Sequence, residues 1–256
     1  MKVKDWCSVV KQEQIGTGIY SMWLEAPVIA SSAVPGQFVS LYSRDSSRLL
    51  PRPISLCEID GDKGLLRLVY RVAGKGTEEF SELKSGDKVS VMGPLGNGFP
   101  LNQAEGKKVF LIGGGIGIPP MLETARRLKA DKQILLGYRD ERFLQEEFEQ
   151  VGDVFVATED GSYGTHGNVM DAIREQGLTA DVMFACGPTP MLRAVKRYAE
   201  DQRIPCWISM EERMACGIGA CLACVCQSRD VDAHSNVHNK RICKDGPVFE
   251  ASEVEL

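Results

Sequence analysis

Five of the nine cysteines of this chain lie between Ser209 and Cys243, at a spacing that suits metal binding. Cys216, Cys221 and Cys224 stand in C-x4-C-x2-C spacing, and Cys243 follows further along the chain. This is the plant-type spacing for ligands of a [2Fe–2S] cluster, whose fourth thiolate comes from a distant position. Glycines at 217 and 219 let the backbone bend closely around a cluster and direct amide N–H groups at its sulfurs. The run predicts an iron–sulfur cluster on these four cysteines.

Two other chemistries fit part of the same segment. Structural zinc uses pairs of ligands, and Cys221 with Cys224 forms one pair while His234 and His238, in H-x3-H spacing, would supply another. A disulfide scaffold is less favoured because the chain is long and its first residues do not read as a secretory signal. Cys226 would share a strand face with Cys224 and could replace it as a ligand. We interpret Cys226 as a neighbour of the cluster rather than a ligand.

Two short segments in the first hundred residues could bind a phosphate. The first is Arg52, Pro53, Ile54 and Ser55, and the second is the turn 74–77, which contains Gly76 and Thr77. An arginine beside a strand can bind a phosphate with two parallel hydrogen bonds, and a glycine-rich turn that opens a helix offers free N–H donors. Each pattern is common by chance. Their order and their separation of about 20 residues favour a shared anion site.

The elements that must position these segments begin with short strands. Apolar residues alternate with polar ones over 20–24, 38–42, 66–72 and 88–92, and turn-forming residues separate these stretches. We find no long helical pattern among them. Short strands at this spacing predict a small antiparallel β-barrel over residues 1–100.

The pattern changes after the turn formers at 93–99. Continuous apolar strands are predicted at 108–112, 133–138, 154–158, 181–185 and 207–210, with helices at 121–129, 141–150, 168–176 and 190–201. Strands that alternate with helices in this way predict a parallel sheet covered by helices with right-handed crossovers, here over residues 101–208. Residues 209–256 would form a third, small cysteine module. Ligands bind at the carboxyl ends of the strands in such sheets.

Two loops at those carboxyl ends could hold a dinucleotide. A glycine run after the first strand could approach a pyrophosphate, although its spacing is not G-x-G-x-x-G; its members are Gly113, Gly114, Gly115 and Gly117. The loop after the fourth strand could lie against a nicotinamide; it contains Cys186, Gly187 and Pro188. The alternative for Cys186 is a buried small residue. Asp140 favours a free ribose hydroxyl and hence NAD over NADP, although Arg139 beside it weakens that preference.

Composition excludes several classes of protein. The net charge of −5 and the pI near 5.4, without a concentrated basic patch, argue against a nucleic-acid partner. No apolar run reaches the roughly 18 residues needed to span a bilayer, and the N-terminus lacks an apolar signal segment, so no membrane association is expected. A cytoplasmic location would suit reduced thiols that serve as metal ligands.

The segments 52–55, 76–77, 113–117, 186–191 and the cysteine run resemble, in this order, the ferredoxin reductase family. The resemblance is closest to the electron-transfer subunits of NAD-dependent class 1B dihydroorotate dehydrogenase and covers essentially the whole chain; residues 209–221 are its most specific part. It implies that Arg52 holds the FAD pyrophosphate, Ser55 lies near the isoalloxazine, and Gly76 with Thr77 completes the phosphate clamp. It also implies flavin contacts from the strand residues Val69, Tyr70 and Arg71. One departure is the polar stretch between Cys224 and Cys243, which is a few residues longer than usual.

Ile54 stands where many members of the family have an aromatic residue, so stacking on the flavin must come from elsewhere, and Tyr70 is one candidate. The resemblance further implies a heterotetramer with two copies of an FMN-containing subunit that oxidises dihydroorotate. Electrons would pass from that FMN to the cluster, then to FAD and finally to NAD+. A flavin must lie between a one-electron cluster and a nicotinamide that accepts hydride.

No catalytic acid–base pair is predicted, and alone the chain should act as an NADH-oxidising diaphorase. One alternative is a subunit of another NAD(P)H-linked reductase that serves a ferredoxin, a sulfite reductase or a hydrogenase. A second alternative is a zinc-stapled nucleotide-binding module without redox activity.

Overall fold

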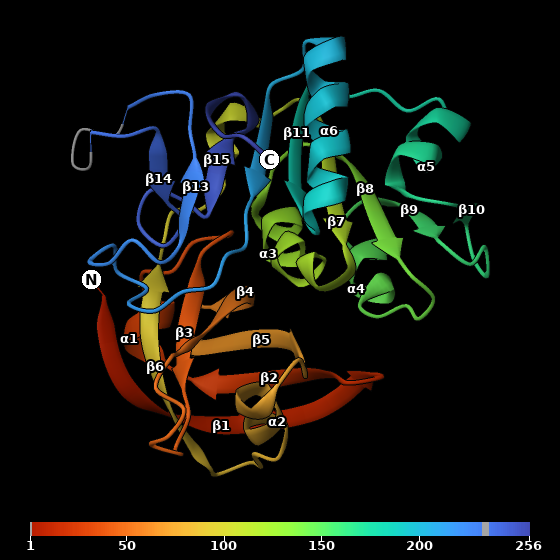
Figure 1. Cartoon of the computed structure of the whole chain (residues 1–256). Coiled ribbons are helices and arrows are strands. Elements are labelled where there is room, and N and C mark those ends of the chain that lie inside the picture. The colour runs from red at the N-terminus through yellow and green to blue at the C-terminus, as the bar shows by residue number, and fades with distance from the viewer. Residues whose placement is uncertain (1, 232–235) are drawn as a thin grey trace.

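The computed structural model describes residues 2–231 and 236–256, which form a β-barrel, a helix-covered sheet and a cysteine-rich C-terminal segment (Figure 1). The barrel is closed and antiparallel, with strand order β1-β2-β5-β4-β3-β6. Its strands are β1 (Val3–Gly16), β2 (Ile19–Glu25), β3 (Phe38–Tyr42), β4 (Arg52–Asp60), β5 (Leu65–Arg71) and β6 (Lys88–Leu95). The short helices α1 (Pro27–Ala30) and α2 (Lys75–Ser81) accompany it.

The predicted barrel is confirmed, and two of its strands were missed by the sequence pattern. The barrel interior is filled by alternate side chains such as Val39, Leu41, Leu66 and Leu68, all fully or nearly fully buried. Strand β1 escaped prediction because most of its side chains are polar and remain partly exposed. The segment 52–55, interpreted as an insert between strands, is instead the beginning of β4. Its side chains are therefore fixed by strand pairing with β3.

The second part is a sheet with order β10-β9-β8-β7-β11-β12-β15, in which all neighbours are parallel except β12 and β15. Its strands are β7 (Lys108–Gly114), β8 (Asp131–Tyr138), β9 (Asp153–Thr158), β10 (Thr165–His166), β11 (Val182–Cys186), β12 (Cys206–Ser209) and β15 (Val248–Glu250). The helices are α3 (Pro119–Arg127), α4 (Gln145–Glu149), α5 (Val169–Glu175) and α6 (Thr189–Gln202), and the short turns η1 (Leu101–Gln103), η2 (Gly115–Gly117) and η3 (Ala251–Glu253) complete the elements.

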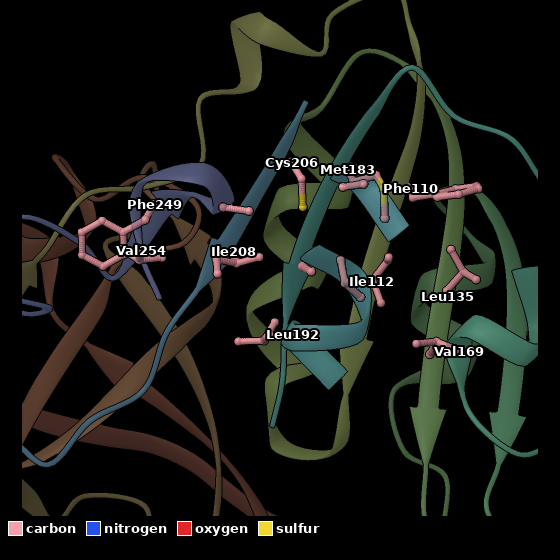
Figure 2. Packing of buried hydrophobic residues seen from close by; sticks show 14 of the residues in the cluster. Phe110, Ile112, Leu135, Val169, Met183, Leu192, Cys206, Ile208, Phe249 and Val254 are labelled. Carbon is pink, nitrogen blue, oxygen red and sulfur yellow. The ribbon is translucent and has the colours of Figure 1, made fainter. Parts of the chain in front are cut away.

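Helices cover both faces of this sheet because alternate side chains of the strands point to opposite faces. On β7, Val109 and Leu111 pack on the face covered by α3 and α4, whereas Phe110 and Ile112 pack on the face covered by α5 and α6. Figure 2 shows this second cluster, in which Leu192 of α6 lies among the strand side chains. The predicted parallel sheet is therefore confirmed.

Some details of the sheet differ from the prediction. Helix α4 was expected to begin at 141, but it begins at Gln145 because Leu144 adopts a left-handed conformation, with φ 61°, directly before it. Glu141 serves another contact, since its carboxylate accepts a hydrogen bond of 2.8 Å from the backbone N–H of Thr17 in the barrel. The short strands β10 and β15 also differ, because no alternating pattern indicated them.

The C-terminal segment is built into the rest of the molecule. It contains the hairpin β13 (Val225–Gln227) and β14 (Asn239–Arg241), and β15 then pairs with β12 at the edge of the sheet. Phe249 and Val254 enter the same apolar cluster as Ile208 (Figure 2). The cysteine run is thereby held between the barrel and the sheet, as the blue segment in Figure 1 shows.

A buried ionic network joins the barrel to helices α3 and α4. Arg67 Nη1 lies 2.5 Å from Glu58 Oε1 and 2.6 Å from Glu147 Oε2, and its Nε donates to Ser21 Oγ at 2.9 Å. Arg126 contacts the other oxygen of Glu58 and lies 3.6 Å from Glu147. The network links three strands of the barrel to two helices of the sheet, so it holds the barrel against the sheet. Among the described residues, no helix is long and apolar enough to cross a membrane.

Candidate functional site

The sheet has a topological switch point between β7 and β11. From β7 the chain proceeds outward through β8, β9 and β10 on one side, and through β11 and β12 on the other. The loops after β7 and β11 therefore separate at the carboxyl ends of these strands, where open α/β sheets bind ligands. These are the glycine loop 113–117 and the loop 186–188, so the structure brings together the two loops that the sequence indicated.

Close packing explains three of the four glycines in the first loop. A Cβ on Gly117 would lie 2.5 Å from the carbonyl oxygen of Cys186, and a Cβ on Gly114 would lie 2.5 Å from the sulfur of Met191. A Cβ on Gly113 would meet Ile118 at 2.9 Å. Gly115 differs, because its φ is +52° and nothing lies within 4 Å of a Cβ built there. Gly115 is thus the position in this loop that a ligand can approach.

Gly115 borders a cavity of about 600 Å³ between the barrel and the sheet. The barrel contributes its first hairpin and the end of β5, and the sheet contributes the end of β8. The lining residues are Thr17, Gly18, Ile19, Arg71, Val72, Gly115, Tyr138, Arg139, Asp140, Glu141 and Phe143. The cavity is large enough for part of a dinucleotide and places Arg71, Arg139 and Asp140 on its wall.

Cys186 stands at the end of β11 and is 2% exposed. Burial, together with the negative charge of Glu211, raises the pKa of its thiol to about 12, although a hydrogen bond with Ser209 opposes the shift. The thiol is therefore protonated at neutral pH and is not poised as a nucleophile. Gly187 and Pro188 follow it on the wall of a second cavity of about 580 Å³, which also reaches Cys226 and the C-terminal Leu256.

The two predicted phosphate-binding segments meet at the start of α2. A Cβ on Gly76 would overlap the guanidinium of Arg52, so the arginine can lie against this turn because residue 76 is glycine. Thr77 Oγ1 accepts hydrogen bonds from the N–H groups of Ala73 at 2.9 Å and Gly74 at 3.2 Å, and it donates to the carbonyl of Gly74 at 3.0 Å. The threonine thus shapes the turn against which the guanidinium of Arg52 lies.

The other predicted flavin-contacting residues occupy different surroundings. Pro53, Ile54 and Ser55 pair with β3, and Ile54 packs against the barrel core. Val69 is buried, whereas Arg71 is exposed at the cavity.

Tyr70 is enclosed by the barrel. It is 1% exposed, its ring stacks on Tyr20 inside the barrel, and its hydroxyl donates to Gln12 Oε1 at 2.9 Å. This burial raises the pKa of Tyr70. Because its ring faces the barrel interior, stacking of Tyr70 on a flavin stays a prediction that would need the side chain to move.

The four predicted ligand cysteines form two pairs. The sulfurs of Cys216 and Cys221 lie 3.3 Å apart, and the backbone N–H of Cys243 points at the sulfur of Cys224 at 3.5 Å. The backbone N–H of Gly219 donates to the sulfur of Cys243 at 3.2 Å and so connects the two pairs. Two thiolates on each of two irons is the ligand set of a [2Fe–2S] cluster. The donor set therefore fits that cluster.

The loop around the first pair favours thiolates. Gly217 and Gly219 have φ values of 69° and 85°, which residues with a side chain rarely adopt. Burial opposes ionisation of Cys216, but hydrogen bonds from the backbone at 218, 220 and 221 and from the Cys221 thiol lower its pKa to about 6. A thiolate that is already stabilised by backbone N–H groups is a ready metal ligand.

Two residues that the sequence analysis did not single out hold this loop in place. Arg241 is 5% exposed, donates to the carbonyl of Gly219 at 3.3 Å and bonds Asp245 through both its backbone N–H and its Nε. Asn97 donates to the carbonyls of Lys244 and Asp245 at 3.1 and 2.9 Å, and so ties the barrel to the turn after Cys243. Asn97 lies in the turn-rich stretch 93–99, which indicated only a boundary.

Cys226 was the alternative cluster ligand, and His234 and His238 were the candidate zinc ligands. The described ones among them make other contacts. Cys226 donates to the carbonyl of Lys240 at 3.6 Å, and burial raises the pKa of its thiol to about 11. His238 Nδ1 lies 2.7 Å from the carbonyl oxygen of Arg229. His234 lies outside the described residues. This geometry favours Cys224 over Cys226 as the ligand, which stays a prediction.

The chain combines a closed antiparallel barrel with a sheet whose ligand crevice lies at a switch point, and a loop of four thiols lies between them. This combination defines an oxidoreductase of the ferredoxin reductase fold with an iron–sulfur site. Comparison with known proteins agrees with this class. Residues 7–99 match the oxidoreductase FAD-binding domain, and residues 211–255 match the iron-sulfur cluster binding domain of dihydroorotate dehydrogenase B.

Similar proteins cover the full chain. The electron transfer subunit of dihydroorotate dehydrogenase B (NAD+) from Geobacillus sp. (strain WCH70) is 42% identical over 100% of both chains. The corresponding protein from Bacillus cereus (strain B4264) is 44% identical over 97% of both. The chain therefore belongs to the family of electron transfer subunits of NAD-dependent dihydroorotate dehydrogenase B. The zinc-stapled module without redox activity is not supported.

Solved structures share the fold. A chain of the NADH-dependent reduced ferredoxin-NADP oxidoreductase, a structure that concerns flavin-based electron bifurcation, has a TM-score of 0.87 and 30% identity, covering 97% of this chain and 89% of that chain. A ferredoxin NADP+ reductase from Neisseria gonorrhoeae with bound FAD and NADP has a TM-score of 0.63 at 16% identity, covering 77% of this chain and 91% of that chain. The second likeness supports the fold alone.

Proposed function

We propose that this subunit passes the electrons of dihydroorotate oxidation, carried out by its catalytic partner, to NAD+. When bound, the cluster supplies one-electron transfer and FAD supplies the conversion to two-electron hydride chemistry. The observation that carries the proposal is the placement of the four-thiol loop, whose Gly217 packs against the outer face of the barrel, one strand from the segment 52–55.

The residues of this chain bind and orient in that scheme. Arg52 and the turn at Gly76 and Thr77 would hold the FAD pyrophosphate, and Ser55 would lie near the isoalloxazine. Gly115, at the open part of its loop, would let the NAD pyrophosphate approach, and the loop of Cys186, Gly187 and Pro188 would receive the nicotinamide. The glycines at 113, 114 and 117 would act indirectly, because they allow these loops to pack.

An anaerobic visible spectrum with iron, sulfide and zinc analysis tests the proposal. Flavin bands and broad cluster absorption should both bleach when NADH is added. Reconstitution with the catalytic subunit should then couple dihydroorotate oxidation to NAD+ reduction. A protein without flavin or iron after reconstitution would refute the cofactor assignment. A loaded protein that reduces a ferredoxin but does not couple to dihydroorotate would favour the alternative reductase role.

The Gly117→Ala variant should separate NAD binding from FAD binding. The added methyl would collide with the backbone of Cys186 rather than with a movable side chain, so the two loops at the switch point must move apart. We expect the KM for NADH in the diaphorase assay to rise by about tenfold or more, because a small misplacement of binding groups costs this much. The FAD content should remain that of the parent protein.

Gly106→Ala is the control, since Gly106 has φ +70° in an exposed turn and nothing within 4 Å of a built Cβ. It should carry backbone strain without an effect on KM. An unchanged KM in Gly117→Ala would contradict the role of this loop contact.

The partner surface is proposed to be the outer face of the cysteine module. One-electron transfer needs the cluster close to the redox centre of the catalytic subunit, and two apolar side chains of the cluster loop, Ile218 and Leu222, are 45% and 56% exposed. We infer an assembly with two copies of each subunit. We also infer a cytoplasmic location, because all nine cysteines are free thiols.

The Leu222→Asp variant should weaken assembly with the catalytic subunit without loss of the cluster. A charge at the centre of an apolar interface leaves a carboxylate without a partner, which costs several kilocalories per mole and should abolish co-elution in gel filtration. Val28→Asp, at a residue 49% exposed on α1 of the barrel, is the matched control. Normal co-elution of Leu222→Asp would place the interface elsewhere.

A further inference from the structure

Ser40 carries a buried hydroxyl with no hydrogen-bond partner in the part of the chain that the structure describes. It lies in the middle of β3, where Val39 and Leu41 point into the barrel and Ser40 points outward. Its side chain is nonetheless fully buried, because the C-terminal segment covers this face. Its Oγ is one of two buried side-chain polar atoms without a partner among the described residues. A buried hydroxyl without a hydrogen bond destabilises a fold, so its partner needs an explanation.

The hydroxyl lies against the cysteine loop. A Cβ built on Gly217, the residue after Cys216, would be 3.1 Å from Ser40 Oγ, and the same position is bordered by Leu95 and Met92. Apart from the serine, these barrel neighbours are apolar, so the site offers the hydroxyl few acceptors from the protein itself. Electron-rich sulfur next to Cys216 would be an acceptor.

Ser40 also adjoins the segment predicted to bind the flavin. It pairs in register with Pro53 of β4, while Met92 of β6 pairs with it from the other side. The serine therefore occupies the strand between residues 52–55 and the cysteine loop. A side chain in this place can affect the cluster without contacting the loop 186–188, which would receive the nicotinamide.

We propose that Ser40 Oγ donates a hydrogen bond to the sulfur atoms of the cluster at the Cys216 side and thereby raises the cluster's reduction potential. This inference rests on the proposed function, because it needs the iron–sulfur cluster to be present. Reduction adds one electron and no proton to the cluster, so the reduced form carries more negative charge on its sulfurs. A hydrogen-bond donor stabilises that form more than the oxidised one.

The test is a redox titration of the purified FAD- and iron-loaded protein, with the reduced cluster followed by electron paramagnetic resonance and the flavin by absorbance. In Ser40→Ala we expect the ratio of reduced to oxidised cluster at a fixed potential to fall about tenfold, which is a shift of about 59 mV for one electron. The flavin potential should stay that of the parent protein. Ser40→Thr, which restores a hydroxyl, should recover most of the shift.

Ser90→Ala is the matched control, because Ser90 is also buried but lies on β6 opposite Tyr42 rather than Gly217. It should leave the cluster potential unchanged. If Ser40→Ala does not retain iron, Ser40→Cys, whose thiol fills the same space and donates weakly, should show a smaller shift in the same direction. An unchanged cluster potential in the loaded variant, a shift confined to the flavin, or an equal shift in Ser40→Thr would overturn the proposal. A parent protein that binds no cluster would instead refute the proposed function.

Discussion

The Cys224→Ala variant is expected to purify with almost no iron and without the broad cluster absorption, whereas Cys226→Ala should keep both. The sulfur of Cys224 accepts a hydrogen bond from the backbone N–H of Cys243, 19 residues further along the chain. Cys226, two residues away on β13, faces the carbonyl of Lys240 instead. Removal of one of four thiolates from a cluster site removes a ligand that no water replaces with similar strength.

Iron and sulfide content, the visible spectrum and the thermal midpoint of both variants measure this difference. The thermal midpoint should fall for Cys224→Ala in particular, because the free energy of metal binding contributes to the stability of the folded module. Cys226→Ala should lose only the packing of one small buried side chain. If Cys226→Ala lost the iron and Cys224→Ala retained it, the ligand assignment would be reversed.

The Arg67→Ala variant should be the most destabilised of the variants outside the cluster. Its guanidinium bridges Glu58 and Glu147, and its own side chain is only 7% exposed. Removal of one partner from a buried ionic network leaves the remaining charge uncompensated, which typically costs 3–5 kcal/mol. Because Arg126 remains next to both carboxylates, we expect about 3 kcal/mol, the lower end of that range.

For a chain of this size that loss corresponds to a fall of roughly 6 to 12 °C in the thermal midpoint. Release of FAD should accompany it, since the network fixes the barrel against α3 and α4. Lys63→Ala is the control: its ion pair with Asp60 is 3.0 Å long, but the lysine side chain is 75% exposed. An exposed pair of this kind contributes at most about 1 kcal/mol. Equal midpoints for the two variants would show that the network does not hold the two parts together.

Much of the architecture followed from local sequence patterns. The alternation of apolar residues in the strands and the helical period between them were sufficient for the barrel and the parallel sheet, because both depend on which side chains face a core. Among the strands that escaped these patterns are β1 and β15. The first has a mostly polar outer surface, and the second is only three residues long and joins the sheet antiparallel to β12. Pairing across the chain, rather than local periodicity, creates both strands.

The residues that define chemistry by type and spacing were already evident in the sequence. The four cysteines, the arginine at 52 with the glycine at 76, and the two loops at the switch point could be identified because thiol spacing, a phosphate-binding turn and strand-loop-helix order are local features. Only the tertiary structure decided which contacts each of these residues makes and therefore which role it can have. It showed that Tyr70 is enclosed by the barrel, that Gly117 serves loop packing while Gly115 faces the cavity, and that Ser40 lies against the cysteine loop. These outcomes depend on contacts between segments far apart in the chain, which spacing along the sequence does not encode.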